Sequence, residues 1–154
     1  MGEKILIPLD GSVVGEAALP HVMDLFSKLS SEVKMEVTLL QVVPLMMHYI
    51  AADEIGAQMA YTEEEMEQAK AKAVAYLNEA GQEFESKGIA VQIRTVVGNA
   101  ADEILKIADE IDADLVAMST HGRSGISRWA FGSIADRVLR GGTRPVLVVR
   151  ATAK

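Results

Sequence analysis

The residues best suited to chemistry lie in one short stretch, residues 119–133, with the sequence STHGRSGISRWAFGS. Three glycines there allow the backbone to approach a ligand closely, and two arginines suit phosphate or carboxylate groups. Gly132 immediately precedes a predicted helix, whose first N–H groups favour an anion. The pattern predicts a phosphate chain lying over residues 122–133. An ordinary loop that ends in a Ser133 helix cap has the same composition.

The charge distribution points to the same part of the chain. The net charge is -7, but residues 119–154 contain seven of the 15 Lys and Arg residues and only one of the 22 Asp and Glu residues. The arginines there either pair with acidic side chains elsewhere in the fold or bind an anion, and charge alone favours neither interpretation. Because the chain as a whole is acidic, we do not expect a nucleic-acid partner.

Other kinds of site are excluded by residue type or spacing. The chain has no cysteine, which excludes disulfides and thiolate metal sites. It has no G-x-x-x-x-G-K-[ST] motif, no G-x-G-x-x-G after the first predicted strand and no G-x-S-x-G elbow. Its three histidines, His21, His48 and His121, form no metal-ligand pattern. We therefore predict neither a catalytic residue nor a metal ion held by the protein itself.

The elements that position this stretch follow from hydrophobic periodicity. Strands are predicted at 4–10, 35–43, 89–97, 113–118 and 144–150, with helices at 11–29, 62–87, 99–111 and 133–142 between them. Such alternation is typical of an open, mostly parallel sheet with helices on both faces. Residues 45–61 show no clean period and are predicted to form a partly apolar loop. We expect one domain over residues 1–154.

In such a sheet, ligands bind beyond the carboxyl ends of the strands, where the strand order reverses. Asp10 follows the first predicted strand, and the stretch 119–133 follows the fourth. These two loops are therefore the candidate site. Asp10 is equally suited to capping the first helix.

At these residues the chain resembles the universal stress protein family, in its ATP-binding subgroup, over nearly its whole length. The resemblance is carried by KILIPLDGS at the start, GNAADEILKIADEIDADLVAMSTHGRSGISRWAFGSIADRVL in the second half and RPVLVV near the end. The family's nucleotide motif is a glycine, two residues, a glycine, nine residues, and then a glycine followed by Ser or Thr. Gly122 and Gly132-Ser133 match this motif, whereas Ser119 replaces its first glycine. If that position needs an unusual backbone angle, Ser119 predicts weakened ATP binding.

The resemblance implies a five-stranded parallel sheet of order 3-2-1-4-5, a Rossmann-like fold of the adenine nucleotide alpha hydrolase type. It also implies ATP as the ligand, with Mg²⁺ bound through the phosphates. Asp10 would contact the adenosine and Val42 the adenine, although Val42 and Met118 also suit a core and His121 also suits bonding to the loop backbone. The nucleotide-binding residues implied by position are Pro8, Leu9, Asp10, Val42, Met118, Ser119, His121, Gly122, Gly132, Ser133, Ile134 and Ala135.

The expected function is that of a nucleotide-responsive stress or signalling protein in the cytoplasm. The apolar last strand, 144–150, has no charge inside its RPVLVV run, and such an edge favours pairing with a second copy. Relatives dimerise through this strand, so a homodimer is expected. Without a poised catalytic base, any ATPase activity is expected to be slow. No apolar run is long enough to cross a bilayer, so no membrane partner is expected. The alternative is a nucleotide-free dimeric interaction or chaperone-like module that uses residues 45–61.

Overall fold

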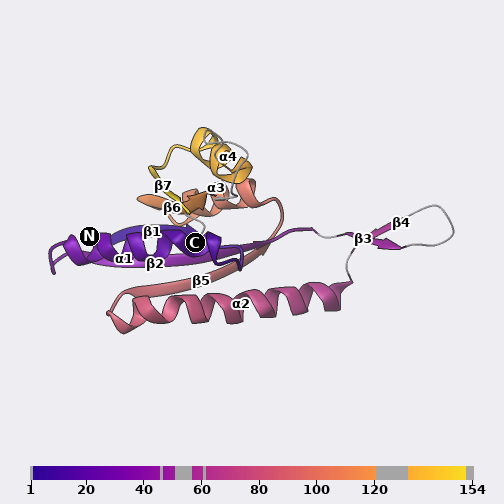
Figure 1. Ribbon diagram of the computed structural model, residues 1–154, viewed down its shortest axis with the longest axis horizontal. Helices are drawn as coiled ribbons and strands as arrows, with labels where there is room; N and C mark the ends of the chain where they lie inside the picture. Colours follow the sequence, from indigo (N-terminus) through magenta and orange to yellow (C-terminus); the bar gives the residue numbers. More distant parts are fainter. Residues whose placement is uncertain (1, 46, 51–56, 61, 121–131, 152–154) are drawn as a thin grey trace.

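A parallel sheet forms the centre of the molecule (Figure 1). The computed structural model describes residues 2–45, 47–50, 57–60, 62–120 and 132–151, with only the backbone described at 47–50 and 57–60. Within these ranges the sheet has five strands in the order β5-β2-β1-β6-β7, which confirms the predicted order 3-2-1-4-5. The strands are β1 (Gly2–Pro8), β2 (Lys34–Val43), β5 (Ala90–Val97), β6 (Leu115–Thr120) and β7 (Val146–Arg150).

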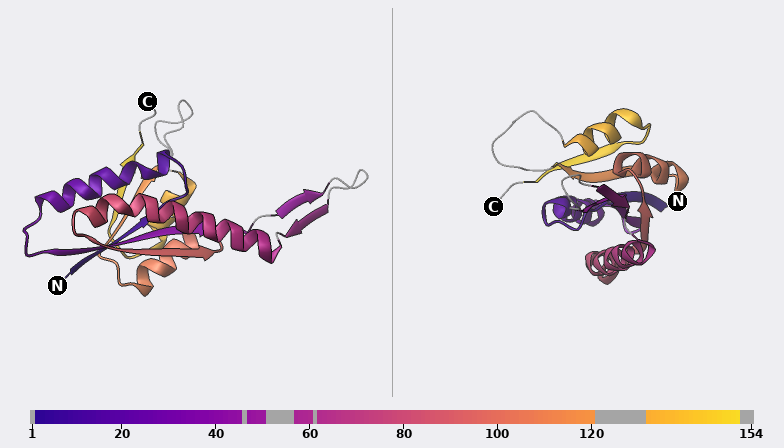
Figure 2. Two further views of the ribbon diagram at one scale, coloured as in Figure 1. Left: turned by 90° about the horizontal axis from the view of Figure 1, so that it is seen from below. Right: turned by 90° about the vertical axis from the view of Figure 1, so that its right-hand side faces the viewer.

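Helices cover both faces of this sheet (Figure 2). One face carries the short 3-10 turn η1 (Val14–Ala17), α1 (Ala18–Lys28) and α2 (Glu63–Ser86). The other carries α3 (Ala100–Glu110) and α4 (Ser133–Gly141). Thr62 caps α2 as predicted, because its hydroxyl oxygen accepts a hydrogen bond from the Glu65 N–H at 3.2 Å. Gly88, at a φ of +80°, follows the last turn of α2 as expected.

The core consists of two apolar clusters, one on each face of the sheet. Alternate side chains of a strand point to opposite faces. Ile5 and Ile7 therefore pack with the cluster under α1 and α2, while Leu6 packs with the cluster under α3 and α4. Leu39 and Leu40 of β2 divide in the same way. Burial on both faces fixes the register of the central strands, and with it the loops at their carboxyl ends.

The prediction of a loop over residues 45–61 was wrong for part of that segment. The antiparallel strands β3 (Met47–Ile50) and β4 (Ala57–Ala60) pair there as a hairpin. Each strand has four residues, which is too short for an alternating pattern to stand out in the sequence. In Figure 1 the hairpin projects beyond the end of the sheet, away from the body of the molecule.

The prediction that Ser133 caps α4 was also wrong. Gly132 is the N-cap residue, and Ser133 is the first residue of the helix. The Asp136 N–H donates to the Gly132 carbonyl oxygen at 2.9 Å, so the first helical turn already closes on Gly132. No side chain caps this helix.

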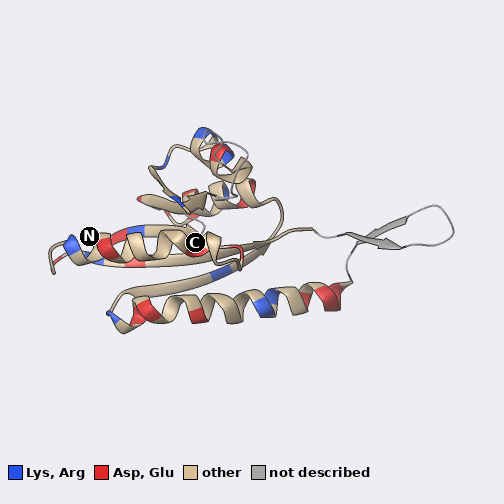
Figure 3. Cartoon of the chain, viewed as in Figure 1, with Lys and Arg blue, Asp and Glu red and all other residues tan. Residues whose placement is uncertain are grey.

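The arginines near the end of the chain mostly pair with aspartates. Arg137 Nη2 lies 2.7 Å from an Asp102 oxygen, and Arg140 Nε lies 2.8 Å from an Asp136 oxygen. Arg144 reaches Asp112 at 2.8 Å and Asp109 at 3.3 Å, and blue and red residues alternate on this part of Figure 3. The hydrogen bonds that Arg140 donates to Asp136, and Arg144 to Asp112 and Asp109, raise the pKa of both arginines. Pairing within the fold is therefore confirmed for three arginines, while Arg123 and Arg128 lie outside the described residues.

Candidate functional site

A pocket opens at the carboxyl edge of the sheet, where the strand order reverses between β1 and β6. The predicted residues that line it are Pro8, Leu9, Asp10, Val42, Met118, Ser119, Gly132, Ile134 and Ala135. Ser133 is next to this set in the chain but does not line the pocket. His121 and Gly122 lie outside the described residues. The fold thus brings together predicted residues from four separate segments of the chain.

Asp10 organises the turn that follows β1. Its Oδ1 accepts hydrogen bonds from the Ser12 N–H, at 2.9 Å, and from the Ser12 hydroxyl. The Ser12 hydroxyl oxygen in turn accepts from the Gly15 N–H at 3.0 Å. Neither η1 nor α1 has a side-chain cap, so Asp10 does not serve the capping role. Its second carboxylate oxygen has no hydrogen bond within the described part of the chain, and Asp10 is one of the residues that line the pocket.

Gly15 is required beside this carboxylate. A Cβ atom at Gly15 would lie 2.5 Å from Asp10 Oδ1, closer than such atoms approach in real structures. Any larger residue would push Asp10 out of the turn. Gly11, at a φ of +84°, supplies the left-handed backbone that reverses the chain between them.

Ser119 fastens η1 to the sheet. It lies in β6 opposite Val149, and its hydroxyl donates to the Gly15 carbonyl oxygen at 2.9 Å while accepting from the Ala18 N–H at 3.0 Å. Among the described non-glycine residues, Asp112 alone has a positive φ, so position 119 does not need the unusual backbone angle that would disfavour serine. The hydroxyl is fully engaged in holding the turn.

The start of α4 forms the cationic end of the pocket. The first N–H groups of a helix have no partner within the helix and carry a partial positive charge. In α2 and α3, Thr62 and Asn99 cap this end with side-chain oxygens, but Gly132 has no side chain to do so. Ile134 and Ala135, in this first turn, line the pocket, and no acceptor for their N–H groups is found among the residues that the structure describes.

Part of the pocket lining is apolar. Met118, Leu9 and Ile104 are 5%, 4% and 3% exposed, and Val42 is half-buried beside them. The described residues enclose about 90 Å³, whereas sites for small molecules usually enclose roughly 300 Å³ or more. The described walls alone would therefore surround only part of a nucleotide. No three His, Cys, Asp or Glu side chains gather to hold a metal ion within the ranges that the structure describes.

Five residues of the pocket were missed by sequence reasoning: Val14, Gly15, Ala100, Ile104 and Thr120. Most of them have no charged or reactive side chain, so they are not identified when the sequence is searched for catalytic or ligand-binding residues. Ala100 and Ile104 begin the helix after β5, and the small residues of GNAA were the one available signal, because they leave room at the sheet edge. Thr120 directly follows Ser119 and could have been included by position.

Comparison with known proteins identifies the family. The model of the Universal stress protein family matches residues 1–150. This chain belongs to the universal stress protein family. Universal stress protein MJ0577 of Methanocaldococcus jannaschii is 31% identical over 163 residues, which cover 97% of this chain and 96% of the relative. Universal stress protein MJ0531 of the same organism is 29% identical over 152 residues, covering 99% and 84% of the two chains.

Solved structures of universal stress proteins share the fold. The structure of MJ0577 superposes with a TM-score of 0.74 and 26% identity, covering 99% of this chain and 98% of that one. A universal stress protein in complex with cAMP superposes at 0.63 and 22% identity, covering 97% and 98%. A family protein from Arabidopsis thaliana with AMP bound superposes at 0.67 and 16% identity, covering 98% and 93%. Because the last two structures are only 22% and 16% identical to this chain, their similarity to it concerns the fold alone.

The helices were also compared with the requirements for crossing a membrane. Across the described ranges, none of them combines the length and the apolar character that crossing a bilayer requires.

Proposed function

We propose that this chain binds ATP at the carboxyl edge of its sheet, with Mg²⁺ on the phosphates, and acts as a nucleotide-responsive stress or signalling protein. The observation that carries the proposal is the uncapped start of α4 in the same pocket as Asp10 and an apolar wall. An adenine nucleotide has the matching order of groups: an apolar base, a ribose with hydroxyl donors, and an anionic phosphate chain.

Each end of the pocket suits one part of that ligand. Val42 and Met118 offer an apolar surface to adenine, and the free oxygen of Asp10 can accept a hydrogen bond from a ribose hydroxyl. The open N–H groups of Ile134 and Ala135 can donate to phosphate oxygens. His121 and Gly122 would extend this cradle, as the family motif implies. Mg²⁺ would be carried by the phosphates, since it usually keeps several of its waters and commonly binds through substrate phosphates.

The fold neighbours support the ligand class. One was solved in complex with cAMP and another with AMP bound. Both ligands contain adenine, ribose and phosphate, which are the parts that the two ends of the pocket would recognise. ATP is our choice within that class, because it follows from the Gly122 and Gly132-Ser133 spacing.

Two further properties belong to the proposal. β7 pairs with β6 alone among the described strands, so its outer edge is open for a second copy of residues 144–150. Asp10 is the one ionisable side chain among the described residues that line the pocket, and its Oδ1 is committed to Ser12. We therefore propose a cytoplasmic homodimer that hydrolyses ATP slowly at most.

The test begins with the purified protein. Denaturing it and analysing the supernatant by mass spectrometry shows whether an adenine nucleotide is carried along, and calorimetric titration with ATP and Mg²⁺ measures its affinity. Gly132→Val places a branched side chain at the mouth of the pocket and should abolish binding. Ala75→Val, on the exposed side of α2, is the matched control and should bind normally. Equal ATP binding by the two variants would contradict the proposed site.

A second function, a nucleotide-free interaction or chaperone-like module, is favoured by the projecting β3–β4 hairpin. An isolated two-stranded hairpin is only marginally stable in water, so such an element gains from a partner surface. Deleting residues 46–60 should abolish partner binding under this second function and leave ATP binding intact under the first. Absence of nucleotide and of binding heat in the unaltered protein would make the second function the better one.

A further inference from the structure

A second and larger cavity lies on the other side of η1 from the nucleotide pocket. It is a groove of about 410 Å³ between α1 and α2, within the range of roughly 300–1,000 Å³ that is usual for small-molecule sites. None of its lining residues was singled out by the sequence motifs, and none lines the nucleotide pocket. Figure 2, left, shows the two helices running along the same face of the sheet.

The groove exists because the two helices sit over different strands. α2 contacts β5 and β2, whereas α1 contacts β6 and β7. Gly81 holds α2 down on the sheet, since a Cβ atom there would already lie 3.1 Å from Val91 Cγ1 and 3.4 Å from Leu39 Cδ1. The side chains that face the gap include Pro20 and Ala80, which are too short to close it.

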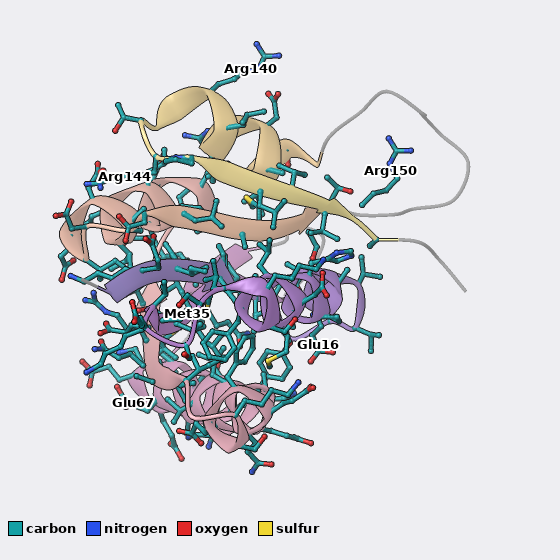
Figure 4. The ribbon with its side chains drawn as sticks, turned by 90° about the vertical axis from the view of Figure 1, so that its left-hand side faces the viewer. Glu16, Met35, Glu67, Arg140, Arg144 and Arg150 are labelled. Carbon is teal, nitrogen blue, oxygen red and sulfur yellow. The ribbon has the colours of Figure 1, made fainter. Side chains whose placement is uncertain are left out.

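The floor of the groove is apolar and its rim is anionic. Met23 and Phe84, 7% and 1% exposed, form the floor, and Leu19 forms part of the wall. Three glutamates complete the lining, with no lysine, arginine or histidine among the lining residues: Glu16, Glu79 and Glu83. Figure 4 labels Glu16, on the same side of the sheet as α1 and α2.

These carboxylates have little positive charge to balance them. Glu79 has neither a hydrogen bond nor an ion pair within the described part of the chain. Glu83 is 3.9 Å from the Lys87 ammonium, and both side chains are at least half exposed, so that pair contributes little. Glu79 and Glu83 are one helical turn apart, a spacing at which like charges repel. A bound cation would relieve this repulsion.

Tyr76 adds an aromatic donor to the rim. Its hydroxyl donates to Glu16 Oε1 at 3.1 Å. Burial and the neighbouring Glu16 raise the pKa of Tyr76 above its usual value, so the phenol stays protonated and keeps donating at physiological pH. Aromatic faces attract organic cations, and the Met23 thioether packs well against aromatic groups.

We propose that the α1–α2 groove is a binding site for a small organic cation with an apolar, preferably aromatic, body. The ammonium or guanidinium group lies at the glutamate rim, beside Glu79 and Glu83, and the body packs on Met23 and Phe84. A bare metal ion does not fit, because no group of three potential ligands suited to one is present among the described residues. An anion is repelled, and a neutral apolar molecule leaves the carboxylates without a counter-charge.

The test uses the full chain and three probes of one shape: phenethylammonium, phenethyl alcohol and phenylacetate. Calorimetric titration at low ionic strength should show saturable one-to-one binding of the amine. The alcohol should bind at least about tenfold more weakly and the acid should not bind, because they lack the charge that the rim recognises. The amine should bind equally well when ATP is present in excess, which separates this site from the nucleotide pocket.

Variants locate the site. Glu79→Gln combined with Glu83→Gln should weaken amine binding at least about tenfold without altering the circular dichroism, since both side chains are exposed. Glu85→Gln, on the same helix but outside the groove, is the matched control and should bind like the unaltered chain. Amide resonance shifts on titration should gather at residues 16–23 and 76–84.

Three results of these titrations and variants would overturn the proposal, and a peptide-binding experiment gives a fourth. They are equal affinity for the amine and the acid, unchanged amine affinity in the double variant, or resonance shifts gathered elsewhere. Binding of a lysine-rich peptide with no binding of the amine would also overturn it, because the groove would then be a protein-docking surface.

Discussion

The two faces of the sheet hold their helices in different ways. On one face α3 and α4 lie close together: a Cβ atom at Gly142 would lie 2.7 Å from Leu105 Cδ2, and Arg137 joins the helices through Asp102 at 2.7 Å. On the other face α1 and α2 leave a groove of about 410 Å³, bridged at one end by the Tyr76–Glu16 hydrogen bond.

The position of small residues explains this difference better than charge does. Gly141 and Gly142 present their bare backbone to Leu105 of α3, so the helices approach each other. Gly81 instead presents its backbone to Val91 of β5, so α2 approaches the sheet and not α1. Exposed ion pairs contribute little free energy to stability. The Arg137–Asp102 pair therefore adds little to the contact between α3 and α4, which Gly141 and Gly142 already permit.

The largest expected change in stability comes from placing a leucine among the helices of each face in turn. Ala108, on the buried side of α3, is 2% exposed, and Ala108→Leu should lower the free energy of unfolding by about 1–3 kcal/mol through overpacking. Ala80 faces the groove, which has room for the larger side chain, so Ala80→Leu should change stability by about 0.5 kcal/mol or less. Urea denaturation measures both. Equal losses would mean that the groove is closed in solution.

The next effect concerns the attachment of η1 to the sheet. Ser119→Ala removes the hydrogen bonds to the Gly15 carbonyl and from the Ala18 N–H, which keeps only the Glu16 carbonyl oxygen, and should cost about 1–3 kcal/mol. ATP affinity should fall as well, because the freed turn carries Val14 and Gly15 of the pocket. Ser86→Ala removes an exposed hydroxyl that bonds to its own helix, and this control should cost far less in thermal unfolding. Unchanged stability in Ser119→Ala would show that the turn holds without the hydroxyl.

Breaking the ion pair between α3 and α4 should have a smaller effect. Arg137→Ala should cost about 0.2–1 kcal/mol, since its side chain and that of Asp102 are 55% and 60% exposed. The cost should shrink further at high salt, which screens exposed pairs. Arg140→Ala, whose partner Asp136 is on the same helix, is the comparison. If Arg137→Ala lowered the free energy of unfolding several times more than Arg140→Ala, the ion pair and not the glycines would hold α3 and α4 together.

The smallest effect appears only in alkali. The pKa of Tyr76 is raised in the folded protein, so above pH ~10, the usual tyrosine pKa, the unfolded chain loses a proton that the folded protein keeps. Folding is then increasingly disfavoured as the pH rises. Tyr76→Phe removes this contribution, and its free energy of unfolding should fall less steeply above pH ~10 than that of the unaltered chain. Parallel pH profiles in chemical denaturation would contradict the buried-phenol interpretation.

Sequence reasoning predicted the sheet because its physics is local. Apolar runs such as KILIP and long amphipathic patterns identify strands and helices directly, and alternation of the two favours a parallel sheet. It also selected two loops that meet at one edge of the sheet, since Asp10 and the start of α4 line one pocket there. The identity of the nucleotide, the metal and the dimer remain predictions.

The rest depends on contacts between distant residues. The bonds of Ser119 reach Gly15 and Ala18, more than 100 residues earlier in the chain, so no local pattern reveals them. The groove depends on the close approach of α2 to the sheet at Gly81. Ala80 and Pro20, which line the groove, have no feature in the sequence that distinguishes them from other helix residues. The strands β3 and β4 have four residues each, which is too short for a strand pattern to be recognised in the sequence.

The place of β1 has a consequence for how the chain folds as it leaves the ribosome. β1 lies between β2 and β6, and its Ile5 pairs with Leu115 far along the chain. Until β6 has been synthesised, one edge of β1 has no neighbour, and the apolar Leu6 lacks its cover. Emerging chains that stop before residue 113 are therefore the aggregation-prone species, and the sheet closes only when the last quarter of the chain arrives.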